Sequence, residues 1–138
     1  MKLEVVADAT GTPIGLVTAA ASVAETELIG PALDSIPQAV ALADGVPVIA
    51  DRGYDSDLLR SELANRGFIL LSPHRSNRTK EPTNDGRRMR RYKRRWIIER
   101  TMSWMHSFRR LMVRHEYYSF IYNGFAHLAL ALFTLSRF

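Results

Sequence analysis

The sequence predicts an α/β protein in which helices flank a mixed sheet. Short runs rich in β-branched residues alternate with segments of helical periodicity, and this alternation is typical of α/β layering. Two of the short runs end in Ala-Asp followed by a turn that contains glycine, at Asp8 and at Asp51. With 138 residues, 46% of them hydrophobic, the chain has room for a single domain, 1–138, around one core.

The first part of the chain predicts a hairpin followed by a helix and a further strand. β-Branched residues favour a strand at 3–7, and glycine and proline within 9–13 mark a turn. Residues 14–19 continue as a strand that pairs with the first in a hairpin. Apolar residues recur at helical spacing within 25–34, and residues 47–50 form the next strand.

The middle of the chain predicts a second helix and a short strand. Asp55 or Ser56 is a suitable N-cap for a helix that runs to about Asn65. Gly67 stands at the position where a helix commonly ends, since glycine adopts the left-handed conformation required there. Residues 68–71 then form a short buried strand.

The last part of the chain predicts a loop and two helices. Residues 72–91 are polar, basic and interrupted by proline and glycine, which indicates a loop inserted before the next helix. Helical periodicity follows over about 91–108 and again over 117–136. The final helix carries no charged residue and is about as long as a membrane span, but its polar residues favour a packed core helix, and we expect no membrane partner.

Charge is divided unevenly along the chain. Residues 1–74 hold 4 Lys and Arg against 10 Asp and Glu, a net charge of −6, whereas residues 75–138 hold 15 against 4, a net charge of +11. A half-chain this basic fits a phosphate-backbone partner, and the alternative is a solvated basic surface without a specific partner. The chain has no cysteine, which excludes disulfides and thiolate metal sites. No signal-peptide pattern is present, so we expect a cytoplasmic protein.

Two carboxylates are expected at one edge of the sheet. Asp8 and Asp51 each follow the carboxyl end of a predicted strand. If the strands 3–7 and 47–50 are parallel neighbours, both carboxylates emerge on the same edge, where ligands of open α/β sheets gather. Beside a strongly basic surface, such acids indicate divalent-metal chemistry on a polyanion.

A third acid, Glu99, lies within the basic helix predicted at 91–108. At about 100° per residue, one face within roughly 40° of Glu99 holds Tyr92, Arg95, Ser103 and His106. The opposite face holds the residues Ile97, Thr101, Trp104, Met105 and Phe108. Glu99 therefore points outward or into a cleft, and the alternative is a surface glutamate in contact with Arg95.

Three motifs follow one another in the sequence. They are Ala50-Asp51-Arg-Gly53-Tyr54-Asp-Ser, Tyr92-x2-Arg95-x3-Glu99 and Trp104-x3-Phe108-Arg109-Arg110-Leu111. Together they resemble the catalytic, C-terminal part of bacterial insertion-sequence transposases of the Asp-Asp-Glu type, from the insertion sequence five family or a close relative. Asp8, in Val-Ala-Asp-Ala-Thr-Gly-Thr-Pro, matches the first catalytic position of that pattern.

This resemblance implies an RNase H-like fold and a DNA transposase that cleaves and transfers strands at transposon ends. It implies two Mg²⁺ or Mn²⁺ ions, with Asp8, Asp51 and Glu99 as the catalytic residues and metal ligands. The partners it implies are double-stranded DNA, as transposon ends and target, and a second copy in a homodimeric synaptic complex near the bacterial nucleoid. The residues expected to contact DNA are Tyr92, Lys93, Arg94, Arg95, Arg100, His106, Arg109 and Arg110.

The chain departs from the family pattern in three respects. His106 stands where the family usually has a lysine seven residues after the glutamate, and histidine is a weaker, pH-dependent cation. The acid often found after the second strand has no clear counterpart, because Glu25 is nearby but does not stand at the expected position. The N-terminal DNA-recognition region is absent, so it is expected on a separately encoded part. The alternative is a truncated, catalytically inactive remnant that acts at most as a non-specific nucleic-acid-binding domain.

The remaining histidines and tryptophans carry weaker signals. His74, His115 and His127 have no zinc-ligand spacing and are expected to be surface or core residues. Tryptophans usually pack in cores, but Trp96, on the side of Glu99, is a better candidate for contact with a DNA base than Trp104.

Overall fold

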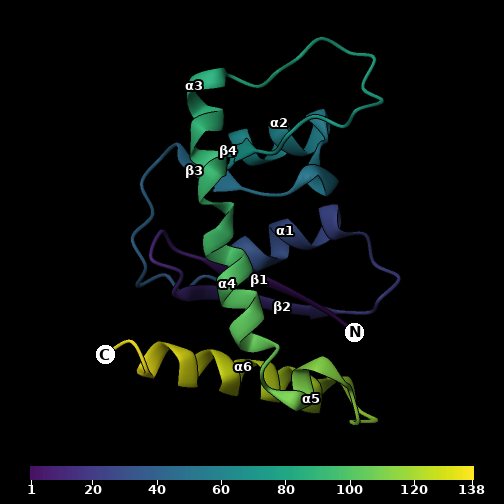
Figure 1. Cartoon of the computed structure of the whole chain (residues 1–138), viewed down its shortest axis with the longest axis vertical. Helices are drawn as coiled ribbons and strands as arrows, with labels where there is room; N and C mark the ends of the chain where they lie inside the picture. Colours follow the sequence, from purple (N-terminus) through teal and green to yellow (C-terminus); the bar gives the residue numbers. More distant parts are fainter. The chain divides into compact units, whose positions relative to one another are not determined.

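The computed structural model describes all residues, 1–138, and divides into two compact units (Figure 1). The first unit comprises Met1–Gln38 and Ile97–Phe138, and the second comprises Ala39–Trp96. The elements of the first unit are β1 (Lys2–Ala7), β2 (Pro13–Ala19), α1 (Glu25–Asp34), α4 (Trp96–Met105, entering from the second unit), α5 (Arg109–Met112) and α6 (Ser119–Leu135). Those of the second are β3 (Val46–Ile49), η1 (Arg52–Tyr54), α2 (Asp57–Asn65), β4 (Phe68–Leu71), α3 (Gly86–Met89) and η2 (Arg90–Arg95).

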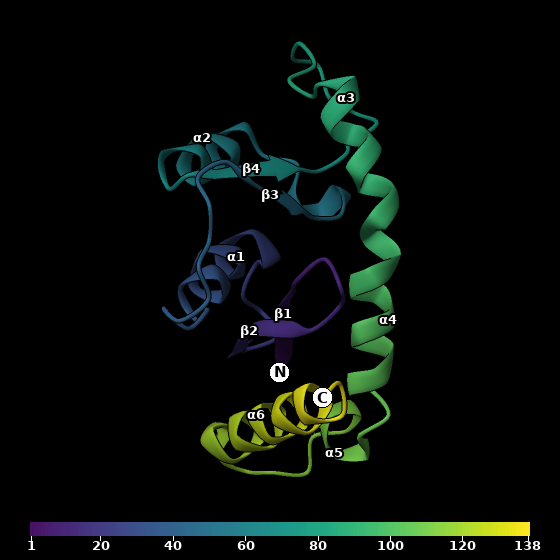
Figure 2. The ribbon, with the colours of Figure 1, turned by 90° about the vertical axis from the view of Figure 1, so that its left-hand side faces the viewer.

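The first unit is built on the antiparallel hairpin β1–β2, in which Val5 lies opposite Leu16. Helices α1 and α6 lie on opposite faces of this hairpin (Figures 1 and 2). Close approach of α1 requires glycine in β2, because a Cβ on Gly15 would lie 2.8 Å from the carbonyl oxygen of Ala32. Ser35, at the end of α1, accepts a hydrogen bond from the Leu16 N–H at 2.8 Å and so fastens the helix to the strand.

The core of the first unit lies between the hairpin and α4, α5 and α6. Its buried residues are Leu16, Met105, Leu111, Tyr122, Ala126 and Ala129. Trp104 packs edge-to-face against Phe108 and Phe133, with ring centroids 4.9 and 4.5 Å apart. The buried residues on α6 bear out the expected core helix, and no helix of the structure has the length and apolar character of a membrane span.

The second unit is built on a parallel pair of strands, β3 and β4, with Val48 opposite Leu70. Helix α2, which connects them, packs on β4. Of the two proposed N-caps, the side chain of Ser56 accepts the bond from the Leu59 N–H, at 3.3 Å. Gly67 has a φ of +82°, the left-handed conformation that ends the helix as expected.

The mixed α/β class is confirmed, but the strands form two ladders. Residues 3–7 pair with β2, and residues 47–50 overlap the strand that pairs with β4. The expected single mixed sheet is therefore present only as one antiparallel and one parallel two-stranded ladder.

Two boundaries near the basic segment differ from the prediction. The loop expected at 72–91 ends earlier, because the carboxylate of Asp85 accepts a bond from the Arg87 N–H at 2.9 Å and caps α3. The helix expected to reach residue 108 ends at Met105. The N–H of Phe108 bonds to the carbonyl three residues back, and its extended backbone turns the ring onto Trp104.

Candidate catalytic site

The turn after β1 holds the side chain of Asp8 in one orientation. Its Oδ1 accepts hydrogen bonds from the N–H groups of Thr10 and Thr12, at 2.8 and 3.0 Å, and from the Thr10 hydroxyl at 2.7 Å. The turn closes through the Gly11 N–H, which bonds to the Asp8 carbonyl, and Gly11 has a φ of +86°. Since all three side-chain bonds go to Oδ1, the Oδ2 atom of Asp8 accepts none.

These hydrogen bonds also set the charge of Asp8. Partial burial raises the pKa of its carboxyl, but the hydrogen bonds from Thr10 and Thr12, with a smaller effect of the nearby Gly11 N–H, outweigh burial and lower the pKa below its usual value. Asp8 therefore stays ionised at neutral pH, which is the form that binds a cation.

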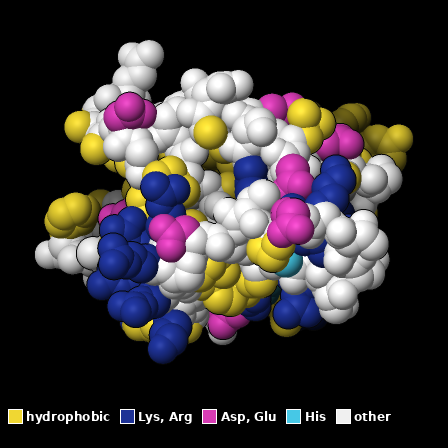
Figure 3. Space-filling view, turned by 90° about the horizontal axis from the view of Figure 1, so that it is seen from above, with side chains coloured by type: hydrophobic (Ala, Val, Ile, Leu, Met, Phe, Trp, Pro, Cys, Tyr) yellow, Lys and Arg dark blue, Asp and Glu magenta, His cyan; other side chains and the backbone are white.

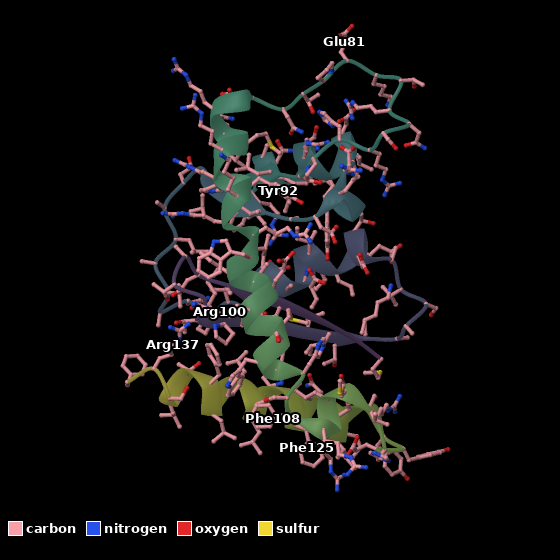
Figure 4. All side chains as sticks on the ribbon, viewed as in Figure 1. Glu81, Tyr92, Arg100, Phe108, Phe125 and Arg137 are labelled. Atoms are coloured by element: carbon pink, nitrogen blue, oxygen red, sulfur yellow. The ribbon has the colours of Figure 1, made fainter.

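The Asp8 turn is fastened to the turn of α4 that carries Glu99. The buried hydroxyl of Thr101 donates to the Gly11 carbonyl at 2.8 Å, and Nη2 of Arg100 donates to the Thr10 carbonyl at 3.1 Å. Arg137, after α6, donates to the same Thr10 carbonyl at 2.9 Å (Figure 4). The first and third acids therefore lie in one unit, on segments in direct contact, and Glu99 is exposed as expected.

The fit at this contact is close. A Cβ on Gly11 would lie 3.0 Å from Arg100 Nη2, 3.1 Å from Ile97 and 3.2 Å from the Thr101 hydroxyl. Only glycine has both the backbone conformation and the small size that this position requires.

Asp51 lies in the second unit, where the parallel ladder ends. The Ala50 N–H still bonds to the Leu71 carbonyl, at 3.0 Å, so Asp51 directly follows the paired backbone. Its Oδ1 accepts a bond from the Gly53 N–H at 2.7 Å, and its carbonyl accepts one from the Ser72 hydroxyl at 2.6 Å. As in Asp8, the Oδ2 atom accepts no hydrogen bond.

The donor atoms of these acids suit a hard divalent cation. Asp8 and Asp51 each present a carboxylate oxygen that no hydrogen bond occupies, and oxygen donors are the ligands that Mg²⁺ and Mn²⁺ prefer. The structure contains no group of three or more acidic or histidine side chains close enough together to hold a metal ion. The convergence of Asp8, Asp51 and Glu99 draws on both units and stays a prediction.

The helical segment before α4 forms a basic surface. Its exposed cations are Arg87, Arg88, Arg90, Arg91, Lys93 and Arg94. Figure 3 shows a large group of Lys and Arg side chains on the left of the face seen there, and smaller groups in its centre and on its right. Tyr92 and Arg95 are half-buried and contact each other, since Arg95 Nη1 donates to the Tyr92 hydroxyl at 2.8 Å. Trp96 is 54% exposed. Of the predicted DNA-contacting residues of this segment, Lys93 and Arg94 are therefore exposed, whereas Tyr92 and Arg95 are half-buried.

The predicted DNA-contacting residues of the first unit divide into two kinds. His106 and Arg109 are exposed. Arg110 is also exposed, but its Nη1 pairs with Glu116 at 2.6 Å, and its guanidinium lies 5.1 Å from the ring centroid of Phe125. Arg100 bonds to the Asp8 turn. Arg100 and Arg110 therefore have structural partners, whatever they contribute to DNA binding.

One cluster was not predicted from the sequence. The Asp55 side chain is only 3% exposed and binds Arg60 Nη1 at 2.7 Å, His74 Nδ1 at 2.9 Å and the Arg75 N–H at 2.7 Å. Beside it, Asp57 binds Arg78 Nη2 at 2.9 Å. His74 is therefore neither an isolated surface residue nor a core residue. Arg60 lies close in sequence to both aspartates, and its i,i+3 spacing from Asp57 is a local signal, but His74, Arg75 and Arg78 lie far along the chain and give none.

The cluster keeps Asp55 ionised. Burial raises the pKa of its carboxyl, but hydrogen bonds from the Arg75 N–H, His74 and Arg60 hold the pKa well below its usual range. A buried carboxylate with this many donors fixes the backbone segments that supply them.

Comparison with known proteins gives three matches. The family model described as Transposase DDE domain matches residues 1–134. A Burkholderia cepacia protein named as a transposase for insertion sequence element IS402 is 36% identical over 137 residues, which cover 95% of this chain and 61% of that protein. A Brucella ovis protein named as a transposase for insertion sequence element IS6501 is 36% identical over 107 residues, 72% of this chain and 78% of that protein. No solved structure matches.

Proposed function

Because the chain belongs to the Transposase DDE domain family and spans 61% of the length of the IS402 relative, we propose that it is the catalytic part of a DNA transposase. Its proposed activity is metal-dependent cleavage of DNA strands at transposon ends and their transfer to a target. The order of the three acids along the chain and the family match support this proposal.

The observation that carries the proposal is the docking of the Asp8 turn onto the turn of α4 that bears Glu99. Two hydrogen bonds, from Thr101 to Gly11 and from Arg100 to Thr10, hold these segments together. Glu99 and the ionised carboxylate of Asp8 therefore lie on segments in direct contact, as ligands of one metal site would.

The fold proposed for the active enzyme is RNase H-like. Asp8, Asp51 and Glu99 would hold the metal ions there, and the Oδ2 atoms of the two aspartates are carboxylate oxygens available for this. A pair of Mg²⁺ or Mn²⁺ ions, when bound, would supply activation of the attacking hydroxyl and stabilisation of the leaving oxygen.

The proposed substrate contacts come from the basic residues of α3 and η2. Their exposed guanidinium and ammonium groups bind phosphates of double-stranded DNA, which positions the strand without reading its sequence. Trp96 offers an exposed ring for contact with a base. The proposed synaptic complex contains two copies of the chain as a homodimer.

The test is strand cleavage of a duplex that carries the element's end sequence. The wild type is expected to nick this DNA with Mg²⁺ or Mn²⁺ and not with EDTA. Glu99→Gln should abolish nicking and keep DNA affinity, because glutamine retains the shape but loses the anionic ligand oxygen. The matched control is Glu62→Gln, at an exposed position of α2, which should nick like the wild type.

Two outcomes would count against the proposal. Equal nicking by the wild type and Glu99→Gln would remove Glu99 from the metal site. DNA binding without any metal-dependent nicking by the wild type would favour the inactive, nucleic-acid-binding remnant.

A further inference from the structure

We propose that Asp55 and Arg75 are positioning residues that hold the proposed metal ligand Asp51 in its binding orientation. The proposal rests on the proposed metal-binding role of Asp51. It assigns a function to the buried Asp55 cluster, which lies entirely within the second unit.

A continuous path of hydrogen bonds joins Asp55 to the carboxylate of Asp51. The Oδ2 atom of Asp55 accepts the Arg75 N–H at 2.7 Å. The Arg75 side chain turns back, and its Nη2 donates to the Gly53 carbonyl at 2.9 Å. The Gly53 N–H in turn donates to Asp51 Oδ1 at 2.7 Å. Both peptide groups of Gly53 are thus fixed, and the orientation of the Asp51 side chain is fixed with them.

A second path reaches the backbone of Asp51. The hydroxyl of Ser72, a fully buried residue, donates to the Asp51 carbonyl at 2.6 Å. The Ser72 carbonyl accepts a bond from Arg60 Nη2 at 3.0 Å, and Arg60 Nη1 binds Asp55 Oδ1 at 2.7 Å. Hydrogen-bonded paths from Asp55 therefore reach both the side chain and the backbone carbonyl of Asp51.

The segment that supplies these donors, residues 72–84, is here called the strap. It is closed on itself, because His74 Nε2 accepts the Thr83 N–H at 3.1 Å and the Asn84 amide donates to the Ser72 carbonyl at 2.9 Å. The acceptor role of Nε2 places the imidazole proton on Nδ1, which faces Asp55 Oδ1 at 2.9 Å. The strap is thus pinned to the turn that follows Asp51.

This arrangement matches what a metal ligand requires from its surroundings. Clustered carboxylates repel one another, so a ligand needs support from neighbouring groups to keep its geometry. Removing a residue that hydrogen-bonds to a metal ligand and orients it typically lowers metal affinity or activity by about 10- to 100-fold. In Asp51 the support reaches Oδ1 and the backbone and leaves Oδ2 available.

The experiment compares two exposed cations of the strap. Arg75→Ala removes the bond to the Gly53 carbonyl, and because Arg75 is exposed the fold should remain intact. Lys80→Ala removes an equal charge from the same strap without touching the Asp51 turn. Mn²⁺ affinity of the DNA-free chain, measured by electron paramagnetic resonance, should fall roughly 10-fold in Arg75→Ala and stay at the wild-type value in Lys80→Ala.

A second readout does not depend on metal. Hydrogen exchange of the Gly53 amide, measured without metal, should be faster in Arg75→Ala than in Lys80→Ala, since its acceptor Asp51 is less firmly held. Asp55→Asn should show both effects more strongly. Asp57→Asn weakens the pairs of Asp57 with Arg78 and Arg60 but leaves the path from Asp55 through Arg75 to Gly53 intact, so its effects on both readouts should be smaller than those of Asp55→Asn. If Asp55→Asn does not fold, the comparison of Arg75→Ala with Lys80→Ala still tests the positioning role.

The outcomes separate this inference from the proposed function. Wild-type Mn²⁺ affinity together with unchanged Gly53 exchange in Arg75→Ala would overturn the positioning role and leave the metal site intact. A wild-type chain that binds no Mn²⁺ would overturn the metal role of Asp51 and the positioning role with it.

Discussion

The hydroxyl of Thr101 donates a buried hydrogen bond of 2.8 Å to the carbonyl of Gly11, across 90 positions of the sequence. This bond joins the turn that orients Asp8 to the turn of α4 that carries Glu99. Within the first unit it is the contact on which the proposed relation between the first and third acids depends.

Thr101→Val should destabilise the protein and impair nicking together. Valine keeps the shape but leaves the Gly11 carbonyl without its donor, which costs about 1–3 kcal/mol of unfolding free energy. Urea denaturation measures this cost. The control is Thr134→Val, which loses only a bond within α6 to the Leu130 carbonyl and should cost about 1 kcal/mol or less. Equal stability losses in the two variants would contradict the role of the Thr101 bond.

Trp104→Ala should unfold the first unit more easily. Its ring contacts Phe108 and Phe133 but is only half-buried, so the expected loss is about 3 kcal/mol, the lower end for a large aromatic removed from a core. Trp96→Ala is the matched control, because that ring is 54% exposed, and should cost about 1 kcal/mol or less. A larger loss in Trp96→Ala than in Trp104→Ala would contradict the assigned core.

DNA affinity should depend steeply on salt. Residues 75–114 hold 14 of the 19 Lys and Arg, and each phosphate contact should add about 0.9 to the slope of log affinity against log salt concentration. Lys93→Ala should reduce this slope by about one contact, whereas Lys2→Ala, whose ammonium binds the Val23 carbonyl, should leave it unchanged. Fluorescence anisotropy at several salt concentrations measures the slope. A DNA affinity that does not change with salt concentration would exclude the basic surface as the DNA-binding surface.

The Asp55 cluster should make stability sensitive to acid. The pKa of Asp55 is lowered in the folded chain, so its contribution is fully present above the unfolded pKa of about 3.9 and is lost as the pH falls below it. Denaturant unfolding of wild type and Asp55→Asn should therefore differ most near neutral pH, and the difference should shrink between about pH 4 and pH 2. A difference that stays constant over this range would contradict the assigned ionisation.

Local sequence signals were sufficient for most elements. The cap at Ser56, the helix end at Gly67 and the β-branched runs each determine the backbone of only a few neighbouring residues. The structure therefore has these elements close to the predicted positions. The exposed position of Glu99 and the burial of Thr101 and Met105 follow from helical spacing alone.

Contacts between distant residues could not be predicted in this way. Asp55 meets His74 and Arg75 only because β4 returns parallel to β3 and brings the strap beside the turn. The same holds for the bond from Thr101 to Gly11. No local pattern encodes these pairs, because each depends on how separate elements pack.

The central claim is that Asp8, Asp51 and Glu99 form one metal site. The most direct measurement is anomalous X-ray scattering from crystals of the chain soaked with Mn²⁺. The claim predicts two peaks about 3.5–4 Å apart, bound by carboxylate oxygens of all three residues. Mn²⁺ bound by one of these acids alone, or by other side chains while the three carboxylates lie apart, would contradict it.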